Sequence, residues 1–341
     1  MPRKNSAQNT GSSRKSAEEK NSEIDLDTTS DKTSRLRIRA AWMYFVEEKT
    51  QNEIAQHLGL GRVTVVRLLS DARERNEVRF SIQGGVAECI ELERRLERRF
   101  GIREAIVVPL SSPEADACLP ISAATGMHVG KIIRPDLKIG VGWGRTLWES
   151  LAYMSAETAP RMSVVSLLGG ITKAKHFNPA EFAWRFSSLF KAECYMMTAP
   201  AIVDSAQTKT ALIDRCGLKD VFDRVSSLDA VLISVGDMAS ESTPYRYEFI
   251  SEEVRKSMVD EGAVGEFLFN YFDVQGRPVR NSIDDRVMSA PPESIANCPE
   301  RIIASGGVRK SLALLGALRA IKPTTFITDI HCAKKVLDLA G

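Results

Sequence analysis

Short apolar runs alternate with helical patterns along the last two thirds of the chain. The runs that predict strands are EAIVVPL, LKIGVGW, MSVVSLLGG, ECYMMTAP, DAVLISVG, RIIASGG and TFIT. Helical apolar spacing lies between them at 117–134, 145–154, 179–191, 205–225, 308–320 and 330–339. Strands that alternate with helices indicate a mostly parallel sheet covered on both faces. The pattern therefore predicts a Rossmann-like α/β domain over residues 103–341.

Three short helical patterns precede this domain, over residues 35–82. In the first, the positions at helical spacing are expected to form one buried face: Ile38, Ala41, Trp42, Phe45 and Val46. The second opens with a capping box between Thr50 and Glu53 and ends at Gly59. The third runs through RVTVVRLLSDARER and buries Val65, Leu68, Leu69 and Ala72. Three helices around one small core indicate an all-α helix-turn-helix domain.

The start of the third helix offers outward side chains that suit DNA. We expect the contacts to come from Thr50, Gln51, Arg62, Val63, Thr64, Val66 and Arg67. An arginine can hold guanine or only phosphate, and a valine can meet a thymine methyl group. Helical hairpins with a turn glycine also occur in ordinary cores. The capping box, the complete apolar set and the local positive charge favour DNA binding.

The segments that flank the helical domain have different compositions. Residues 1–34 are rich in Ser, Thr, Asn, Lys and Glu, which predicts a disordered tail. The run AECIELERRLERRFG is an amphipathic pattern with Leu92, Leu96 and Phe100 as its stripe. We expect a linker helix over residues 83–102.

The net charge of +2 is unevenly divided. Residues 35–82 carry nine Lys or Arg against six Asp or Glu, while residues 83–341 carry 31 against 32. Any attraction to nucleic acid is therefore local.

The six cysteines are scattered without a Cys-x-x-Cys pair, so we expect no metal site. With no long apolar run and no secretion signal, the expected location is the cytoplasm, on the nucleoid when DNA is bound, with no membrane contact.

A glycine-rich stretch, GVGWGRTL, joins a predicted strand to a predicted helix. Backbone N–H groups converge on an anion in such loops, and the expected phosphate-binding residues are Gly142, Trp143, Gly144, Arg145 and Thr146. The alternative is a plain tight connection. The stretch has neither the spacing of a dinucleotide fingerprint nor the Gly-Lys-Ser/Thr of a nucleotide P-loop.

A second loop, ASGGVRK, repeats this arrangement. Gly306 and Gly307 follow a predicted strand, and Lys310 in the next helical turn could reach an anion over the sheet, unless it is only an exposed lysine. Between the two loops, Asp273 follows an apolar strand and could accept hydrogen bonds from sugar hydroxyls. The alternative for Asp273 is a turn residue that caps its own backbone.

These motifs, in this order, resemble the SorC family of sugar-responsive transcriptional regulators, sometimes grouped with DeoR-type repressors. The resemblance covers about residues 35–340 and rests on TQNEIAQHLGLGRVTVVRLLSDAR, IGVGWGRTL, SLLGG, AVGEFLFNYFDVQGRPV, IASGGVRKSLALLGALRA and ITD. It implies an effector domain related to phosphosugar isomerases, a homodimer or homotetramer, operator DNA, and a phosphorylated sugar or polyol as effector. The family's phosphate loop falls on residues 142–146, and its ligand-facing acid and lysine fall on Asp273 and Lys310. Gly61 and Val66 depart from the family's usual serine and polar residue.

The expected function is regulation of a carbohydrate or polyol catabolic operon, as a repressor, with no cofactor and no catalytic residue. The rival is a phosphosugar isomerase or deaminase with an accessory helical domain. Such an enzyme needs a base, usually a carboxylate with a histidine nearby. His128, His176 and His331 follow no catalytic pattern. Asp237 and Glu266 are candidate bases by residue type alone, and we expect them to be solvated or capping acids.

Overall fold

The computed structural model describes residues 32–75, 77–78, 87–171, 178–246 and 249–341. Residues 1–31 of the predicted tail, part of the predicted linker, and His176 lie outside these residues. The chain divides into two compact units, residues 1–83 and 84–341. Among the described residues, no helix combines the length and apolarity needed to cross a membrane.

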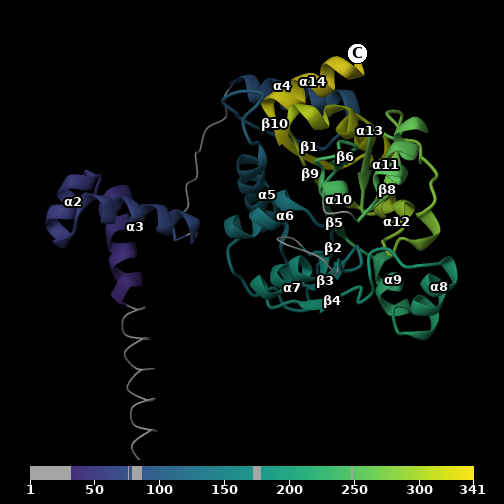
Figure 1. The fold of residues 1–341 in the computed structure, drawn as a ribbon, viewed down its shortest axis with the longest axis horizontal. Coiled ribbons are helices and arrows are strands. Elements are labelled where there is room, and N and C mark those ends of the chain that lie inside the picture. Colours follow the sequence, from purple (N-terminus) through teal and green to yellow (C-terminus); the bar gives the residue numbers. More distant parts are fainter. Residues whose placement is uncertain (1–31, 76, 79–86, 172–177, 247–248) are drawn as a thin grey trace, which may run out of the picture. The chain divides into compact units, whose positions relative to one another are not determined.

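The described residues of the first unit form three helices, of which Figure 1 labels α2 and α3. Residues 32–45 are helical, so the first helix includes three residues that the sequence assigned to the tail. The others are α2 (Gln51–Leu58) and α3 (Arg62–Glu74). The predicted capping box at the start of α2 is present, and Gly59 ends α2 in the left-handed conformation, with φ of 65°. The helix-turn-helix arrangement therefore follows from local signals.

The first helix does not bury the predicted face. Ala41 is buried and Phe45 is half-buried against the core, but Ile38, Trp42 and Val46 are 52%, 58% and 56% exposed. The helix instead turns its smallest side chains, Ala40 and Ala41, and Met43 toward the core. Arg37 is also buried, since its guanidinium pairs with Glu77. The face of the helix that carries the largest apolar side chains is therefore mostly exposed, and a face with smaller side chains packs on the core.

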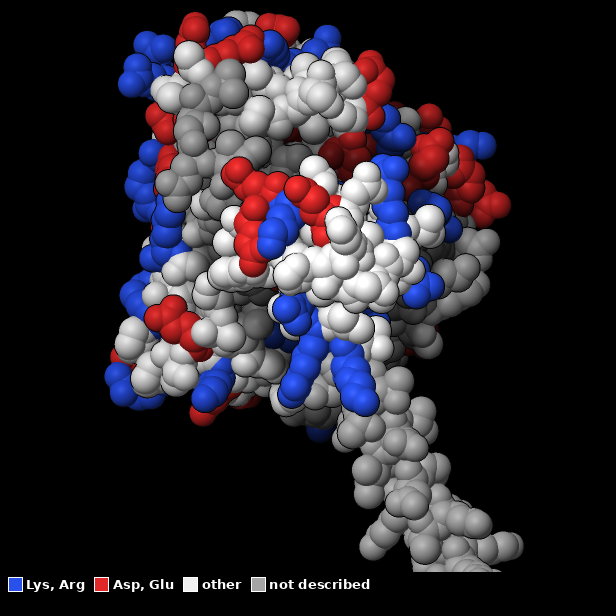
Figure 2. Space-filling model, turned by 90° about the vertical axis from the view of Figure 1, so that its left-hand side faces the viewer, with Lys and Arg blue, Asp and Glu red and all other residues white. Residues whose placement is uncertain are grey.

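On the face of the molecule that Figure 2 shows, basic and acidic side chains of the described residues are interspersed and do not form one continuous basic area. Electrostatic attraction to a polyanion therefore depends on local groups, as the uneven distribution of charge along the sequence indicated.

The second unit contains a parallel sheet in the order β1-β10-β9-β5-β2-β3-β4, with every neighbouring pair parallel. Its strands are β1 (Glu104–Val108), β2 (Lys138–Val141), β3 (Ser163–Ser166), β4 (Glu193–Tyr195), β5 (Ala230–Ile233), β9 (Glu300–Ala304) and β10 (Thr325–Asp329). These are the seven predicted strands, and the predicted α/β fold is confirmed. The chain runs from β2 outward through β3 to β4 and returns to β5 on the other side of β2. The sheet therefore reverses its strand order between β2 and β5, where open α/β sheets bind ligands.

Two apolar cores cover the two faces of this sheet. One face packs against α5 (Cys118–Ile132), α6 (Arg145–Ser150) and α7 (Pro179–Leu189). The other packs against α4 (Ala87–Phe100), α9 (Lys219–Val225), α12 (Pro292–Asn297), α13 (Ser311–Ile321) and α14 (Ile330–Ala340). The remaining helical segments are η1 (Leu151–Tyr153), α8 (Ala206–Arg215), α10 (Thr243–Arg246), α11 (Glu252–Asp260), η2 (Asp284–Arg286) and η3 (Val308–Lys310).

The predicted linker helix is part of the second unit. Leu92 and Leu96 of α4 are buried in the same core as α13 and α14, and Glu93 and Glu97 accept hydrogen bonds from backbone N–H groups of β1. Because α4 is packed along its length against the sheet edge, it does not act as a free connection between the units.

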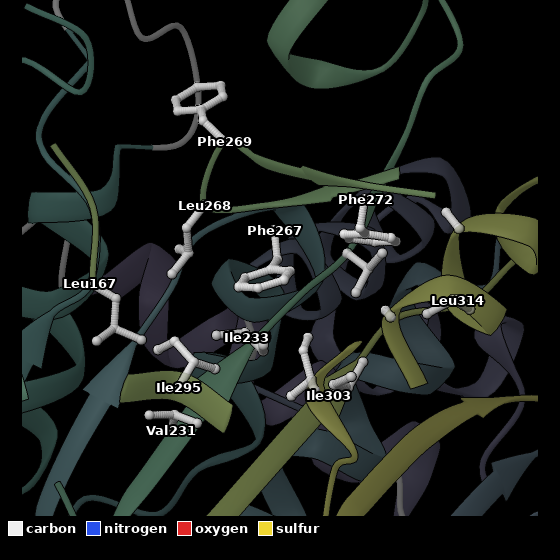
Figure 3. Packing of buried hydrophobic residues seen from close by; sticks show 14 of the residues in the cluster. Leu167, Val231, Ile233, Phe267, Leu268, Phe269, Phe272, Ile295, Ile303 and Leu314 are labelled. Atoms are coloured by element: carbon white, nitrogen blue, oxygen red, sulfur yellow. The ribbon is translucent and has the colours of Figure 1, made fainter. Parts of the chain in front are cut away.

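A small antiparallel sheet consists of β6 (Gly236–Asp237), β7 (Gly265–Phe267) and β8 (Asn270–Phe272). The sequence predicted the apolar strand before Asp273 but not the sheet that it joins. Its hairpin turns at Leu268 and Phe269, which have φ of 52° and 61°. Figure 3 shows that Phe267, Leu268 and Phe272 of this hairpin lie over side chains of the large sheet, such as Ile233 and Ile303. The hairpin therefore closes one core and holds β6 beside the end of β5.

Two glycines of α5 are expected to respond oppositely to alanine. A Cβ on Gly126 would lie 2.7 Å from the Ser150 carbonyl oxygen and 2.7 Å from Tyr153 Cβ, whereas nothing lies within 4 Å of a Cβ on Gly130. Gly126→Ala should destabilise the protein by roughly 1–3 kcal/mol through overpacking. Gly130→Ala should stabilise it by up to about 1 kcal/mol through helix propensity. Urea unfolding of both variants checks this pair, and equal effects would contradict the described packing of α5 on α6.

Candidate functional site

The start of α3 presents the predicted DNA-contacting side chains to solvent. Arg62, Val63, Val66 and Arg67 are exposed, and Thr64 is half-buried. Arg62 Nε donates a hydrogen bond to Gln51 Oε1 at 3.5 Å, so the beginnings of α2 and α3 lie side by side. Thr50 is less available, because its hydroxyl and its backbone N–H are both bonded to Glu53. The structure therefore exposes four of the predicted residues on α3 and places Thr50 in the helix cap, and contact with DNA stays a prediction.

A cavity of about 820 Å³ lies at the carboxyl edge of the large sheet. It is lined by the loops that follow β1, β2, β5 and β9, by β6 and by Glu266 of β7. Of the predicted residues, the lining contains Trp143, Gly144, Arg145, Thr146, Gly306, Gly307 and Lys310. Since β2 and β5 flank the reversal of strand order, the cavity lies where this class of fold binds small molecules.

The loop after β2 is shaped by Gly144. Its φ of 123° is in the region that residues with a side chain rarely adopt. Arg145 follows and forms an ion pair with Asp116 of the loop after β1, with 2.7 Å between Nη2 and Oδ2. Thr146 Oγ1 lies 3.9 Å from Cys118 Sγ. The loop therefore offers a guanidinium and a hydroxyl at one wall of the cavity.

The loop after β9 holds Lys310 over the sheet edge. Lys310 Nζ donates to the Val235 carbonyl oxygen at 2.9 Å and lies 3.5 Å from Ser305 Oγ, both uncharged partners. Gly306 leaves no space for a side chain, since a Cβ there would lie 2.4 Å from Asp329 Oδ2. Gly307 N–H donates to the same carboxylate at 2.6 Å. Lys310 is thus a positioned cation, and the exposed-lysine alternative does not describe it.

Two buried carboxyl groups face the same cavity. Asp237 is 6% exposed and Glu266 is 4% exposed, so neither acid is solvated, whereas each accepts a hydrogen bond from a nearby backbone N–H group, which fits the capping half of the expectation. Asp237 accepts from the Ser242 hydroxyl, and Arg309 Nη2 lies 3.5 Å from its Oδ2. Glu266 Oε2 accepts from Phe269 N–H at 2.9 Å. Burial raises the pKa of Glu266 to about 7, against the opposing effects of this hydrogen bond and of Lys310.

Two predicted residues do not line the cavity. Gly142 is buried, and its N–H donates to the Leu232 carbonyl oxygen at 2.8 Å, so it continues the sheet. Asp273 lies in the turn after β8, where its carboxylate accepts from the backbone N–H groups of Gln275 and Arg277 and from Arg277 Nε. These contacts fit the capping alternative for Asp273, and we leave both residues out of the candidate site.

Sequence reasoning missed several lining residues, among them Asp116, Ser234, Glu241 and Arg309. One signal was present: Asp237 directly follows the predicted strand DAVLISVG, and the carboxyl ends of parallel strands share an edge. No such signal places Glu266 at this edge, because it lies in the sequence far from the loops that follow the large-sheet strands.

The described histidines lie away from the cavity. His57 belongs to the first unit, His128 lies beside Glu104 at the start of β1, and His331 contacts Leu110. None of these three lines the cavity.

A helix-turn-helix unit joined to an α/β unit with an anion-compatible cavity defines a ligand-responsive DNA-binding class of protein. Residues 84–338 match the family described as "Putative sugar-binding domain", and the chain belongs to this family. The predicted resemblance to sugar-binding regulators of the SorC and DeoR type is thereby confirmed.

Several relatives align along nearly the whole chain. The erythritol catabolism regulatory protein EryD of Brucella abortus is 29% identical over 90% of this chain and 98% of its own length. The transcriptional regulator LsrR of Klebsiella pneumoniae is 28% identical over 89% of this chain and 93% of its own. The crystal structure of the full-length sorbitol operon regulator SorC from Klebsiella pneumoniae superposes with a TM-score of 0.70, at 22% identity, over 89% of this chain and 98% of that one. These homologues are transcriptional regulators and not enzymes, which favours binding over catalysis at the buried carboxyl groups.

Proposed function

We propose that this protein is a DNA-binding transcriptional regulator of carbohydrate or polyol catabolism, controlled by a phosphorylated sugar or polyol that binds in the cavity of the second unit. The observation that carries the proposal is the placement of Lys310, Arg145 and two glycine loops around one cavity at the strand-order reversal. The family membership and the regulatory relatives support it.

The chemistry of the cavity fits a ligand with two kinds of group. A phosphate monoester accepts charge-assisted hydrogen bonds from Lys310 and Arg145 and a neutral one from Thr146. The Asp237 carboxylate accepts hydrogen bonds from hydroxyl groups, and Glu266 can accept or donate one according to its protonation. Sugar and polyol phosphates combine both kinds of group. This ligand class therefore matches the lining better than a carboxylic acid without hydroxyls or an apolar metabolite does.

Control of DNA binding requires that the ligand distinguish two states of the protein. We propose that the protein forms a homodimer or homotetramer, and that ligand binding changes how the subunits pack and so changes the spacing of two α3 helices along the operator. A repressor released by its ligand is the simplest form of this coupling. Coupling energies of about 1–3 kcal/mol would change operator affinity by roughly 5- to 150-fold.

Matched pairs of ligands test the proposed ligand class. Thermal unfolding is followed with sugars and polyols, each as the free compound and as its monophosphate ester. We expect the esters of at least one compound to raise the melting temperature at millimolar concentration, with the free compound inactive. Inorganic phosphate serves as the control for a general anion effect. Equal responses to the ester and to inorganic phosphate would contradict recognition of the hydroxyl-bearing part.

Arg67→Ala tests the DNA-binding surface independently of the cavity. Arg67 is exposed on α3, and loss of a guanidinium that contacts guanine or phosphate should weaken binding to the preferred duplex about 5- to 150-fold. The ligand-induced rise in melting temperature should remain. Lys219→Ala on α9, which also removes one exposed positive charge, is the control and should leave DNA affinity nearly unchanged. Fluorescence anisotropy at one fixed salt concentration measures both variants, and equal losses would refute the assignment to α3.

A further inference from the structure

The outward face of α3 carries two valines that the fold does not use. Val63 is 83% exposed and Val66 is 45% exposed, and they lie three residues apart on one side of the helix. The small core of the first unit takes Val65, Leu68 and Leu69 from α3 instead. Branching at Cβ lowers helix propensity. Neither helix formation nor packing therefore accounts for valine at these two positions.

The neighbours of the two valines are cationic and polar. Arg62 precedes Val63, and Arg67 follows Val66, and both arginines are exposed. Gln51 of α2 accepts a hydrogen bond from Arg62 and so holds this guanidinium at the start of α3. Val63 and Val66 thus form an apolar strip with an exposed guanidinium group at each end. Such a strip is complementary to a partner surface on which apolar groups lie between phosphates. This charge pattern selects a nucleic-acid groove over an apolar protein partner.

We infer that Val63 and Val66 read thymine in the major groove by packing against its 5-methyl group. The inference rests on the proposed DNA-binding function and adds the kind of base pair that is read. A valine side chain neither donates nor accepts a hydrogen bond, and the methyl group of thymine is the apolar group that base pairs expose in the major groove. A separation of three residues is about 4.5 Å along the helix axis. The two valines therefore face the same or neighbouring base pairs in each half-site.

Replacement of thymine by deoxyuridine tests this inference, because it removes the methyl group and keeps every hydrogen-bonding group. The full-length protein first selects its preferred duplex from a random pool. Each thymine of the selected half-site is then changed singly to deoxyuridine, and affinity is measured at fixed salt. We expect about a 3- to 10-fold loss at one or two neighbouring thymines and nearly no change elsewhere, as for burial of one methyl group.

Two variants assign the effect to the side chains. Val63→Ala and Val66→Ala should bind the thymine duplex more weakly by a similar factor and should lose the penalty for deoxyuridine at one position each. Val46→Ala removes an exposed valine that directly follows the first helix, with an exposed fraction of 56% that lies between those of Val66 and Val63, and should keep the full penalty. If a selected duplex binds tightly but tolerates deoxyuridine throughout, the inference is wrong and the proposed function stands. If both valine variants keep the deoxyuridine penalty, the assignment to α3 is wrong. If no duplex is selected, the proposed function itself fails, and the inference fails with it.

Discussion

Lys310→Met is expected to raise the dissociation constant for a phosphorylated sugar or polyol by about 10- to 150-fold, because a charge-assisted hydrogen bond contributes roughly 1.5–3 kcal/mol. Methionine keeps an unbranched side chain, one heavy atom shorter than that of lysine, and removes the charge. The Nζ atom is held by the Val235 carbonyl and the Ser305 hydroxyl, which leave its charge available to an anion. The ligand-induced shift in melting temperature, measured over a range of ligand concentrations, reports the loss.

The control for this variant is Lys335→Met on α14, where the side chain is exposed. It removes the same charge from the same unit and should leave the ligand response intact. Because Lys310→Met also leaves the Val235 carbonyl without its hydrogen bond, each variant is compared with itself with and without ligand. A full ligand response by Lys310→Met would show that the cavity does not hold the phosphate as proposed.

Glu266 should make the ligand-free protein less stable as the pH rises. Its pKa is raised to about 7 in the folded state, whereas an unfolded glutamic acid titrates near its ordinary value of about 4.3. The folded state therefore binds the proton more tightly, and its contribution to stability is complete below about pH 4, declines between about pH 4 and 7, and is lost above that. The total change from this group is on the order of 3 kcal/mol.

Glu266→Gln should remove this dependence, because an amide does not ionise. The variant should have nearly the stability of the wild-type protein at pH 5 and exceed it at pH 8, where the wild-type carboxylate is charged and buried. Lys310 and Asp237 also act on Glu266, so the control is Glu261→Gln, an exposed glutamate outside this group. Guanidinium unfolding from pH 5 to 8 gives the comparison. Parallel pH profiles for Glu266→Gln and the wild-type protein would contradict burial of a titrating carboxyl group.

The large sheet could be predicted from the sequence because its strands are buried on both faces. Each strand is a continuous apolar run, and helical spacing separates the runs. The hairpin of β7 and β8 could not be predicted in the same way. Its turn uses Leu268 and Phe269 at positive φ instead of the glycine or asparagine that marks such turns. Hydrogen bonds from Phe269 N–H to Glu266 and from Asn270 to the Phe267 and Leu268 carbonyls hold the turn.

The two glycine loops of the site could also be predicted, since each connects a strand to a helical turn at one edge of the sheet. The buried acids could not, because residue type does not reveal burial. Glu266 lies on β7 of the hairpin that was not predicted, and Asp237 lies on β6, which pairs with β7. The first helix shows the same limit: Trp42 has the larger apolar surface, yet the core takes Ala40 and Ala41, because small side chains let helices approach closely.

The most direct test of the account measures the affinity of the full-length protein for its selected duplex with and without the sugar or polyol phosphate that raises its melting temperature. We predict a change of roughly 5- to 150-fold in the wild-type protein, and a much smaller change in Lys310→Met at the same ligand concentration. A ligand that binds the cavity and leaves the affinity for DNA unchanged would contradict coupling between the two units.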